Sequence, residues 1–174
     1  MAEIGEGTYF AGNSRDGVDA RQNITIGKYC QIADNVRFFD VRNHPCIRHP
    51  KYVANFPTDN LFGGEGSEVE GDFKIGNDVW IGENAVIMSN TEIADGAIIG
   101  AYAVVKGYVP PYAIVVGNPG KIVKFRFDAD NEIINQLLKI QWWNWDKETI
   151  QKRAGDFTDI KKFIEKYGYK NELA

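Results

Sequence analysis

The sequence predicts a mainly β protein, a parallel β-helix of hexapeptide repeats with an inserted loop and a C-terminal helical segment. An aliphatic residue recurs with a period of six, at Ile26, Ile32, Ile75, Ile81, Ile87, Ile93, Ile99 and Val105. A small residue stands four places after each of them, at Cys30, Val36, Val79, Ala85, Thr91, Ala97, Ala103 and Val109. A helix or an amphipathic strand would have a period of about 3.6 or 2 residues, whereas a period of six is typical of hexapeptide solenoids.

Each repeat is expected to form one face of a three-sided coil, so that about three repeats complete a turn. The aliphatic residues then stack in the interior, and the small residues fit the crowded corners. Several aliphatic positions are followed by glycine, where a tight turn disfavours a side chain; these glycines are Gly27, Gly76, Gly82 and Gly100. The alternative, amphipathic strands in a sandwich, would show a period of two and would not keep a phase of six.

The first 25 residues are predicted to form a degenerate first coil. A regular coil begins at Ile26, stops after about Arg37, and resumes with strict repeats only at Ile75. The excursion between them, at about 38–74, contains both histidines and several aromatic residues. A long insertion in a solenoid is usually functional, so we predict a β-helix over residues 1–127 with its active-site loop in the excursion.

Residues 128–174 are predicted to form a helical appendage. Apolar residues spaced by three and four indicate its first helix, at Ile133, Ile134, Leu137, Leu138 and Trp142. Asp128 or Asp130 is the expected cap of that helix, and further helices are expected at about 146–153 and 158–167. The tryptophans of the stretch QWWNWD at 141–146 are expected to pack in a seam against the coil or a neighbouring subunit, rather than to form a ligand-stacking platform.

Composition narrows the class of protein. A chain of 174 residues with 44% hydrophobic content is long and apolar enough for a sizeable core. The net charge of −4, without a long basic run, indicates no nucleic-acid partner. The sequence shows neither a signal peptide nor a membrane-spanning apolar run, and two cysteines cannot support a disulfide framework. A soluble cytoplasmic protein is expected.

Three stretches carry a resemblance to a known family: IGNDVWIG at 75–82, IIGAYAVV at 98–105 and VPPYAIVVGNPGKIVKFRF at 109–127. They resemble bacterial hexapeptide-repeat acyltransferases that use acetyl-CoA. Asn43-His44, the following FPTDNLFGG and the later QWWNWD are similar to the branch of xenobiotic, chloramphenicol and streptogramin acetyltransferases and their polysaccharide O-acetyltransferase relatives. The resemblance implies a left-handed β-helix and a homotrimer whose sites lie between subunits.

Acetyl transfer to a hydroxyl or an amine needs a base that takes the proton of the acceptor. Histidine is the side chain whose ordinary pKa lies nearest neutrality, and the chain has His44 and His49. The resemblance assigns the role of general base to His44, which follows Asn43, whereas His49 matches no family position. Asp40 or a backbone carbonyl is expected to orient the imidazole.

The resemblance also implies where acetyl-CoA binds. Trp80, Gly82 and Ala101 match the family's coenzyme-contacting segments, although Trp80 has an alternative role as a packing residue. The phosphates need cations, and the segment after the coil offers Lys106, Lys121, Lys124 and Arg126. Of these, Lys121 and Lys124 match basic positions of the family's tail. Relatives commonly read VVTKDVPP, whereas this chain reads VVKGYVPP, so the usual lysine position is Gly107 and Lys106 precedes it.

The acceptor is expected to contact the loop, and the candidate residues are Asn43, Tyr52, Phe56, Asp59 and Asn60. The first hypothesis for the acceptor is a sugar in surface-polysaccharide or nucleotide-sugar synthesis, and the alternative is an antibiotic. A zinc-dependent carbonic anhydrase-like protein is less favoured, because such a site needs three imidazoles. A non-catalytic scaffold is the remaining alternative, and it would require neither a histidine-bearing loop nor grouped basic residues.

Overall fold

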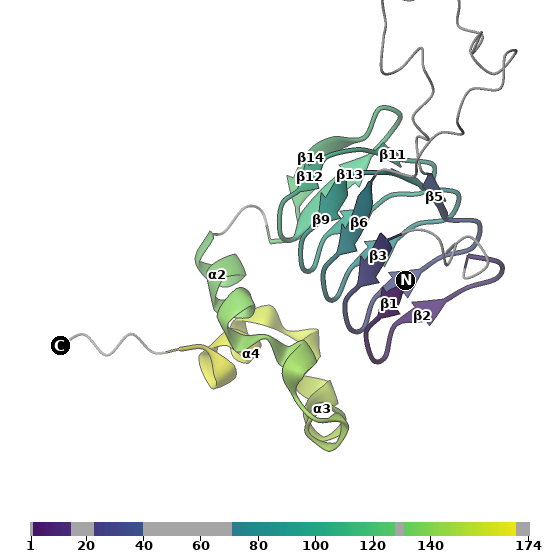
Figure 1. Cartoon of the computed structure of the whole chain (residues 1–174). Helices are drawn as coiled ribbons and strands as arrows, with labels where there is room; N and C mark the ends of the chain where they lie inside the picture. The colour runs from purple at the N-terminus through teal and green to yellow at the C-terminus, as the bar shows by residue number, and fades with distance from the viewer. Residues whose placement is uncertain (1, 15–22, 40–70, 128–130, 170–174) are drawn as a thin grey trace, which may run out of the picture.

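The computed structural model describes residues 2–14, 23–39, 71–127 and 131–169. In these ranges the strands form three sheets whose pairings are parallel except for the last strand (Figure 1). Sheet A contains β1 (Glu3–Ile4), β3 (Asn23–Ile26), β6 (Asp72–Ile75), β9 (Thr91–Ile93) and β12 (Tyr108–Val109). Sheet B contains β2 (Tyr9–Phe10), β4 (Gln31–Ile32), β7 (Trp80–Ile81), β10 (Ile98–Ile99), β13 (Ala113–Val116) and the antiparallel β14 (Lys121–Phe125). Sheet C contains β5 (Arg37–Phe39), β8 (Val86–Met88) and β11 (Val104–Val105).

The chain visits the three sheets in turn, which makes a three-sided coil. Strands β6, β7 and β8 lie in sheets A, B and C, and β9, β10 and β11 repeat that order one layer further along. The pairing keeps the six-residue phase in register, because Ile75 lies opposite Ile93 and Ile81 lies opposite Ile99. Every aliphatic and small position of the predicted repeat is buried. The predicted repeat and its buried interior are therefore confirmed.

A third repeating position, which the sequence analysis missed, forms the corners. The residue three places after the aliphatic one has a positive φ in seven of the eight repeats, and so does Tyr112, which is three places after Val109. These residues are Tyr29, Asn35, Asp78, Asn84, Asn90, Gly96, Tyr102 and Tyr112. Asparagine, aspartate and glycine tolerate this left-handed backbone better than other residues, so five of the eight carried a visible signal. The three tyrosines did not.

The edges of the predicted loop need a correction. Strand β5 extends to Phe39 and β6 begins at Asp72, inside the range of about 38–74 that was assigned to the loop. Phe38 and Phe73 are both buried, with their rings in an edge-to-face contact at 5.7 Å between centroids. These two aromatic residues therefore belong to the core of the coil. Phe38 continues the phase of Ile26 and Ile32, and it was missed because the pattern was sought in aliphatic residues.

The first 25 residues contribute more regular structure than a degenerate coil suggests. Strand β1 pairs with β3 and β2 pairs with β4, both in parallel register. Residues 2–14 therefore add two faces of a coil below the first regular turn.

Three α-helices and two 3₁₀ helices follow the coil in the described residues: α2 (Asn131–Ile140), η2 (Trp142–Asn144), α3 (Lys147–Arg153), η3 (Ala154–Thr158) and α4 (Ile160–Tyr167). Asp146 and Asp159 cap α3 and α4, because their carboxylates accept hydrogen bonds from backbone N–H groups of the first turn. The expected second and third helices are thus confirmed within two residues. Trp142 does not belong to the first helix as predicted, since Gln141 has a φ of 46° and ends it.

The tryptophans pack in a seam, as expected. Trp142 contacts Tyr29 of the coil, with 5.2 Å between ring centroids, while Trp145 stacks on Phe163 of α4 at 5.9 Å. Lys147 also forms an ion pair with Glu6 of the first coil at 2.8 Å. These contacts join the helical segment to one side of the coil (Figure 1). No helix among the described residues has the length and apolar character needed to cross a membrane.

Candidate functional site

The predicted coenzyme residues of the coil lie on sheet B and at its edge. Trp80 points outward from β7, with 45% of its surface exposed. It is therefore not a core residue of its own chain. Its neighbours on the same outward row are Gln31, Ile98 and Ile114. A hollow of about 220 Å³ on this face, the Trp80 hollow, is lined by Tyr29, Gln31, Asp78, Val79, Trp80, Ile98 and Arg126.

Gly82 and Ala101 meet at the corner where the chain leaves sheet B. A Cβ atom at Gly82 would lie 2.5 Å from the backbone nitrogen of Ala101 and 2.9 Å from the carbonyl carbon of Gly100. The backbones of two successive coils therefore approach closely here, and only glycine fits. Gly82 is buried in this contact, whereas Ala101 is exposed at the corner.

We predict that Gly82→Ala lowers the free energy of unfolding by about 1–3 kcal/mol, because the added methyl group meets backbone atoms that cannot rotate away. Denaturant titration of the purified variant measures this loss. Gly155→Ala is the matched control, since a Cβ atom added at Gly155 would have no other atom within 4 Å. Equal stability of the two variants would contradict the close stacking.

The structure brings two of the three predicted lysines to the same face as Trp80. Lys124 pairs with Ile114 and thus ends the row that contains Trp80, and Lys121 pairs with Val116 at the corner above Gly100. Lys106 follows β11 in sheet C, on another face of the coil. Its neighbour Gly107 has a φ of 85°, a conformation that favours glycine over the lysine of relatives.

The remaining predicted site residues lie outside the described residues. They are Asp40, Asn43, His44, His49, Tyr52, Phe56, Asp59 and Asn60. In the part of the chain that the structure describes, no group of three or more histidine, cysteine, aspartate or glutamate residues is placed to hold a metal ion. The assignment of His44 as the base thus stays a prediction.

A larger groove adjoins the Trp80 hollow. This aromatic groove, of about 500 Å³, separates the first coils from α3 and η3, and its lining residues are Gly7, Tyr9, Tyr29, Gln31, Asp78, Trp142, Ile150, Ala154 and Phe157. Asp78, Tyr29 and Gln31 line both spaces. An extended ligand on sheet B would therefore find a continuous surface from Trp80 to the helical segment.

Asp78 and Arg126 form the main charged contact of this region, and the sequence analysis assigned Asp78 no role. A guanidinium nitrogen of Arg126 donates to the Asp78 carboxylate at 2.9 Å and to the Gly96 carbonyl oxygen at 3.0 Å. Burial raises the pKa of Asp78 above its ordinary value, although Arg126 opposes this shift. Because Arg126 is committed to these partners, it is a weaker candidate for phosphate binding than Lys121 or Lys124.

Comparison with known proteins agrees with this architecture. Residues 74–107 match the family described as "Bacterial transferase hexapeptide (six repeats)". A probable macrolide acetyltransferase of Lysinibacillus sphaericus is 42% identical over 137 residues, which are 73% of this chain and 72% of that protein. A chloramphenicol acetyltransferase of Agrobacterium fabrum is 37% identical over 76% of this chain and 65% of its own length. The crystal structure of a maltose O-acetyltransferase from Clostridium difficile matches with a TM-score of 0.51 and 27% identity, over 71% of this chain and 58% of that structure.

The chain therefore belongs to the bacterial hexapeptide-repeat acetyltransferases, an enzyme family. Acetyl-CoA is the co-substrate consistent with that family, as the resemblance of the coil motifs implied.

Proposed function

We propose that this protein transfers the acetyl group of acetyl-CoA to a hydroxyl group of a drug-sized acceptor of the macrolide or chloramphenicol kind. The observation that carries the proposal is the 42% identity to a probable macrolide acetyltransferase over nearly three quarters of both chains. The similarity to a chloramphenicol acetyltransferase supports the same acceptor class. This reverses the order of the two acceptor hypotheses that the sequence alone suggested.

The proposed reaction moves one proton in two transfers, from the acceptor to His44 and from His44 to the leaving sulfur. His44 takes the proton of the acceptor hydroxyl, and the oxygen attacks the thioester carbonyl carbon. A C–O bond then forms, the C–S bond breaks, and the proton passes from the imidazole to the departing sulfur. Asp40 or a backbone carbonyl holds the second imidazole nitrogen, and backbone amides stabilise the oxyanion of the intermediate. Asn43, Tyr52, Phe56, Asp59 and Asn60 are the proposed contacts of the acceptor.

The geometry of sheet B supports a path for the coenzyme parallel to the coil axis. Trp80, Ile98, Ile114 and Lys124 occupy four adjacent strands in one row. Since neighbouring strands lie about 4.8 Å apart, the row spans about 14 Å. In the proposed pose the pantetheine arm follows the edge at Gly82 and Ala101, and Lys121 and Lys124 meet the phosphates.

Lys106 suggests an assembly of several chains. It lies on a different face from Lys124, so its contact with the same coenzyme would come from a neighbouring subunit. We propose a homotrimer with coenzyme sites between subunits. We further propose a left-handed coil over residues 1–127, with the catalytic loop inside it, and a separate helical appendage over residues 128–174.

A sugar hydroxyl is the second candidate acceptor. The maltose O-acetyltransferase structure shares the fold with 27% identity. This identity is lower than that of the macrolide and chloramphenicol acetyltransferases, so it supports a sugar acceptor less strongly. The two candidates use the same base and the same coenzyme, so only the acceptor distinguishes them.

Thiol release from acetyl-CoA tests the proposal directly. The purified full chain is mixed with acetyl-CoA and, separately, with a macrolide, chloramphenicol, a streptogramin, maltose or a nucleotide-linked amino sugar. We expect rapid release with one of the three drugs and a product that is heavier by one acetyl group. Release with a sugar alone would establish the second candidate, and no release with any acceptor would contradict both.

A further inference from the structure

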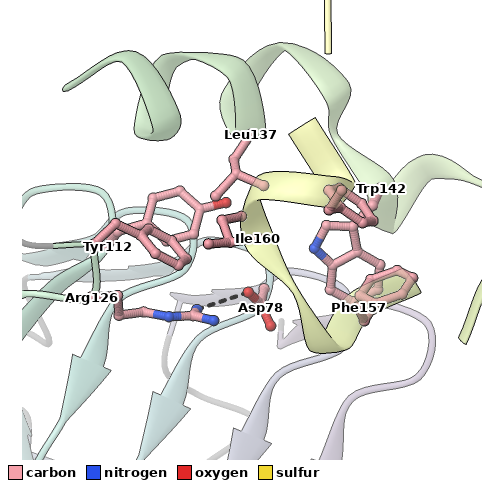
Figure 2. Close-up of a pocket in the computed structure, with 9 residues that line it drawn as sticks. Asp78, Tyr112, Arg126, Leu137, Trp142, Phe157 and Ile160 are labelled. Carbon is pink, nitrogen blue, oxygen red and sulfur yellow. Dashed lines mark hydrogen bonds and ion pairs between the residues drawn. The ribbon is translucent and has the colours of Figure 1, made fainter. Parts of the chain in front are cut away.

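A separate cavity lies between the coil and the helical segment, and the proposed acetyl transfer does not use it. This Tyr112 cavity has a volume of about 170 Å³, and its lining residues are Asp78, Tyr112, Arg126, Phe127, Leu137, Trp142, Phe157, Ile160 and Phe163. Figure 2 shows these side chains converging on one space from the coil, α2 and the last helical elements. None of them is a residue that we assign to the base, the coenzyme or the acceptor.

Most of the lining is apolar, and five of the nine residues are aromatic. An apolar cavity of about 150 Å³ is known to exclude water and to accept a benzene ring. The Tyr112 cavity therefore has the size and the chemistry to hold one six-membered ring, with aromatic faces for stacking.

The hydroxyl group of Tyr112 is the polar feature that the cavity leaves unused. Tyr112 is only 1% exposed, and its hydroxyl is the one fully buried side-chain N or O atom without a hydrogen-bond partner in the described residues. It points toward Leu137 across the cavity (Figure 2). Burial raises the pKa of Tyr112 far above its ordinary value, so the Tyr112 hydroxyl keeps its proton and remains a hydrogen-bond donor. Buried polar groups in folded proteins nearly always have a partner, which makes this hydroxyl an indication of a ligand.

The other polar groups of the lining do not supply that partner. The Arg126 guanidinium is held by Asp78 and the Gly96 carbonyl oxygen, and it lies over the Tyr112 ring at 5.3 Å from the ring centroid. Arg126 thus covers one face of the ring and leaves the hydroxyl free. A ligand with a charged group would have to compete with the ion pair, whereas a neutral ligand would not.

We propose that the Tyr112 cavity binds a small neutral ring compound of about the size of phenol, and that a small shift of the Leu137 side chain opens the buried Tyr112 hydroxyl, which then donates a hydrogen bond to the oxygen of the ligand. The ring packs against the aromatic and aliphatic lining, beside Trp142, Phe157 and Leu137. The ligand reaches the cavity from the aromatic groove, which shares Asp78, Trp142 and Phe157 with it.

Calorimetric titration of the purified full chain with phenol and with benzene tests this proposal. We expect both to bind, and phenol to bind more tightly. Tyr112→Phe keeps the shape of the cavity and removes the hydrogen-bond donor. We therefore expect the affinity for phenol to fall roughly fivefold, which corresponds to the loss of one hydrogen bond, and the affinity for benzene to stay unchanged. The matched control is Tyr102→Phe, because Tyr102 occupies a corner with the same left-handed backbone but is exposed.

Variants that fill the cavity show whether the probes bind in the Tyr112 cavity or elsewhere on the protein. Leu137→Phe places a ring in the space and is expected to abolish binding of both probes; Ile160→Phe serves the same purpose if the first variant does not fold. Thermal unfolding of each variant verifies the fold. Failure of phenol and benzene to bind the native chain would overturn the proposal. Equal binding by native and filled chains would overturn it as well.

Discussion

Replacement of His44 by alanine is expected to lower the rate of acetyl transfer by roughly a hundredfold to ten-thousandfold, the usual contribution of a general base. The loss should appear in kcat, because the imidazole acts on the acceptor proton as the C–O bond forms and contributes little to binding of acetyl-CoA. Steady-state release of free thiol, measured with saturating acetyl-CoA and whichever acceptor is active in the thiol-release experiment, gives the ratio of the two rates.

His49→Ala is the matched control for this experiment. It removes the other histidine of the chain, five residues further on, and is expected to leave kcat within a factor of a few. Circular dichroism and the oligomeric state of both variants distinguish a chemical loss from a folding defect. If His44→Ala remained active while His49→Ala lost activity, the base would be His49 and the family alignment of this loop would be wrong.

The regular part of the fold was predictable because burial in a solenoid repeats. Ile81 and Ile99 occupy the same face in successive coils, so each repeat is an independent observation of one environment. The prediction failed where that regularity ends, as at Phe38, an aromatic residue on the aliphatic phase. Trp142 was misplaced for a related reason, since helical spacing continues past Gln141 although the backbone turns there.

The candidate site was predictable only in its local parts. Gly82 and Ala101 carried a signal, because the close approach of two backbones restricts the residue type. The contact of Asp78 with Arg126 carried none, since the two residues are 48 positions apart and Arg126 lies beyond the last repeat. The sequence also could not tell that Lys106 and Lys124 occupy different faces, because that depends on the turn at 117–120 that reverses β14.

The stacked aliphatic column predicts the largest effect on stability. Ile99 is fully buried between Ile81 of one neighbouring coil and Val115 of the other. Ile99→Ala removes three carbon atoms from a space that the rigid strands on either side cannot close. We therefore expect the free energy of unfolding to fall by about 2–5 kcal/mol, measured by denaturant titration.

Ile98→Ala is the matched control, because it makes the same chemical change one residue earlier in the same strand. Ile98 faces outward from β10 and is partly exposed, so its loss should cost less than about 1 kcal/mol. The difference between the two variants reports which face of the strand is inside, independently of β propensity, which is identical for both. Equal losses would mean that sheet B is buried on both faces, as it would be if its outer face formed the contact between subunits.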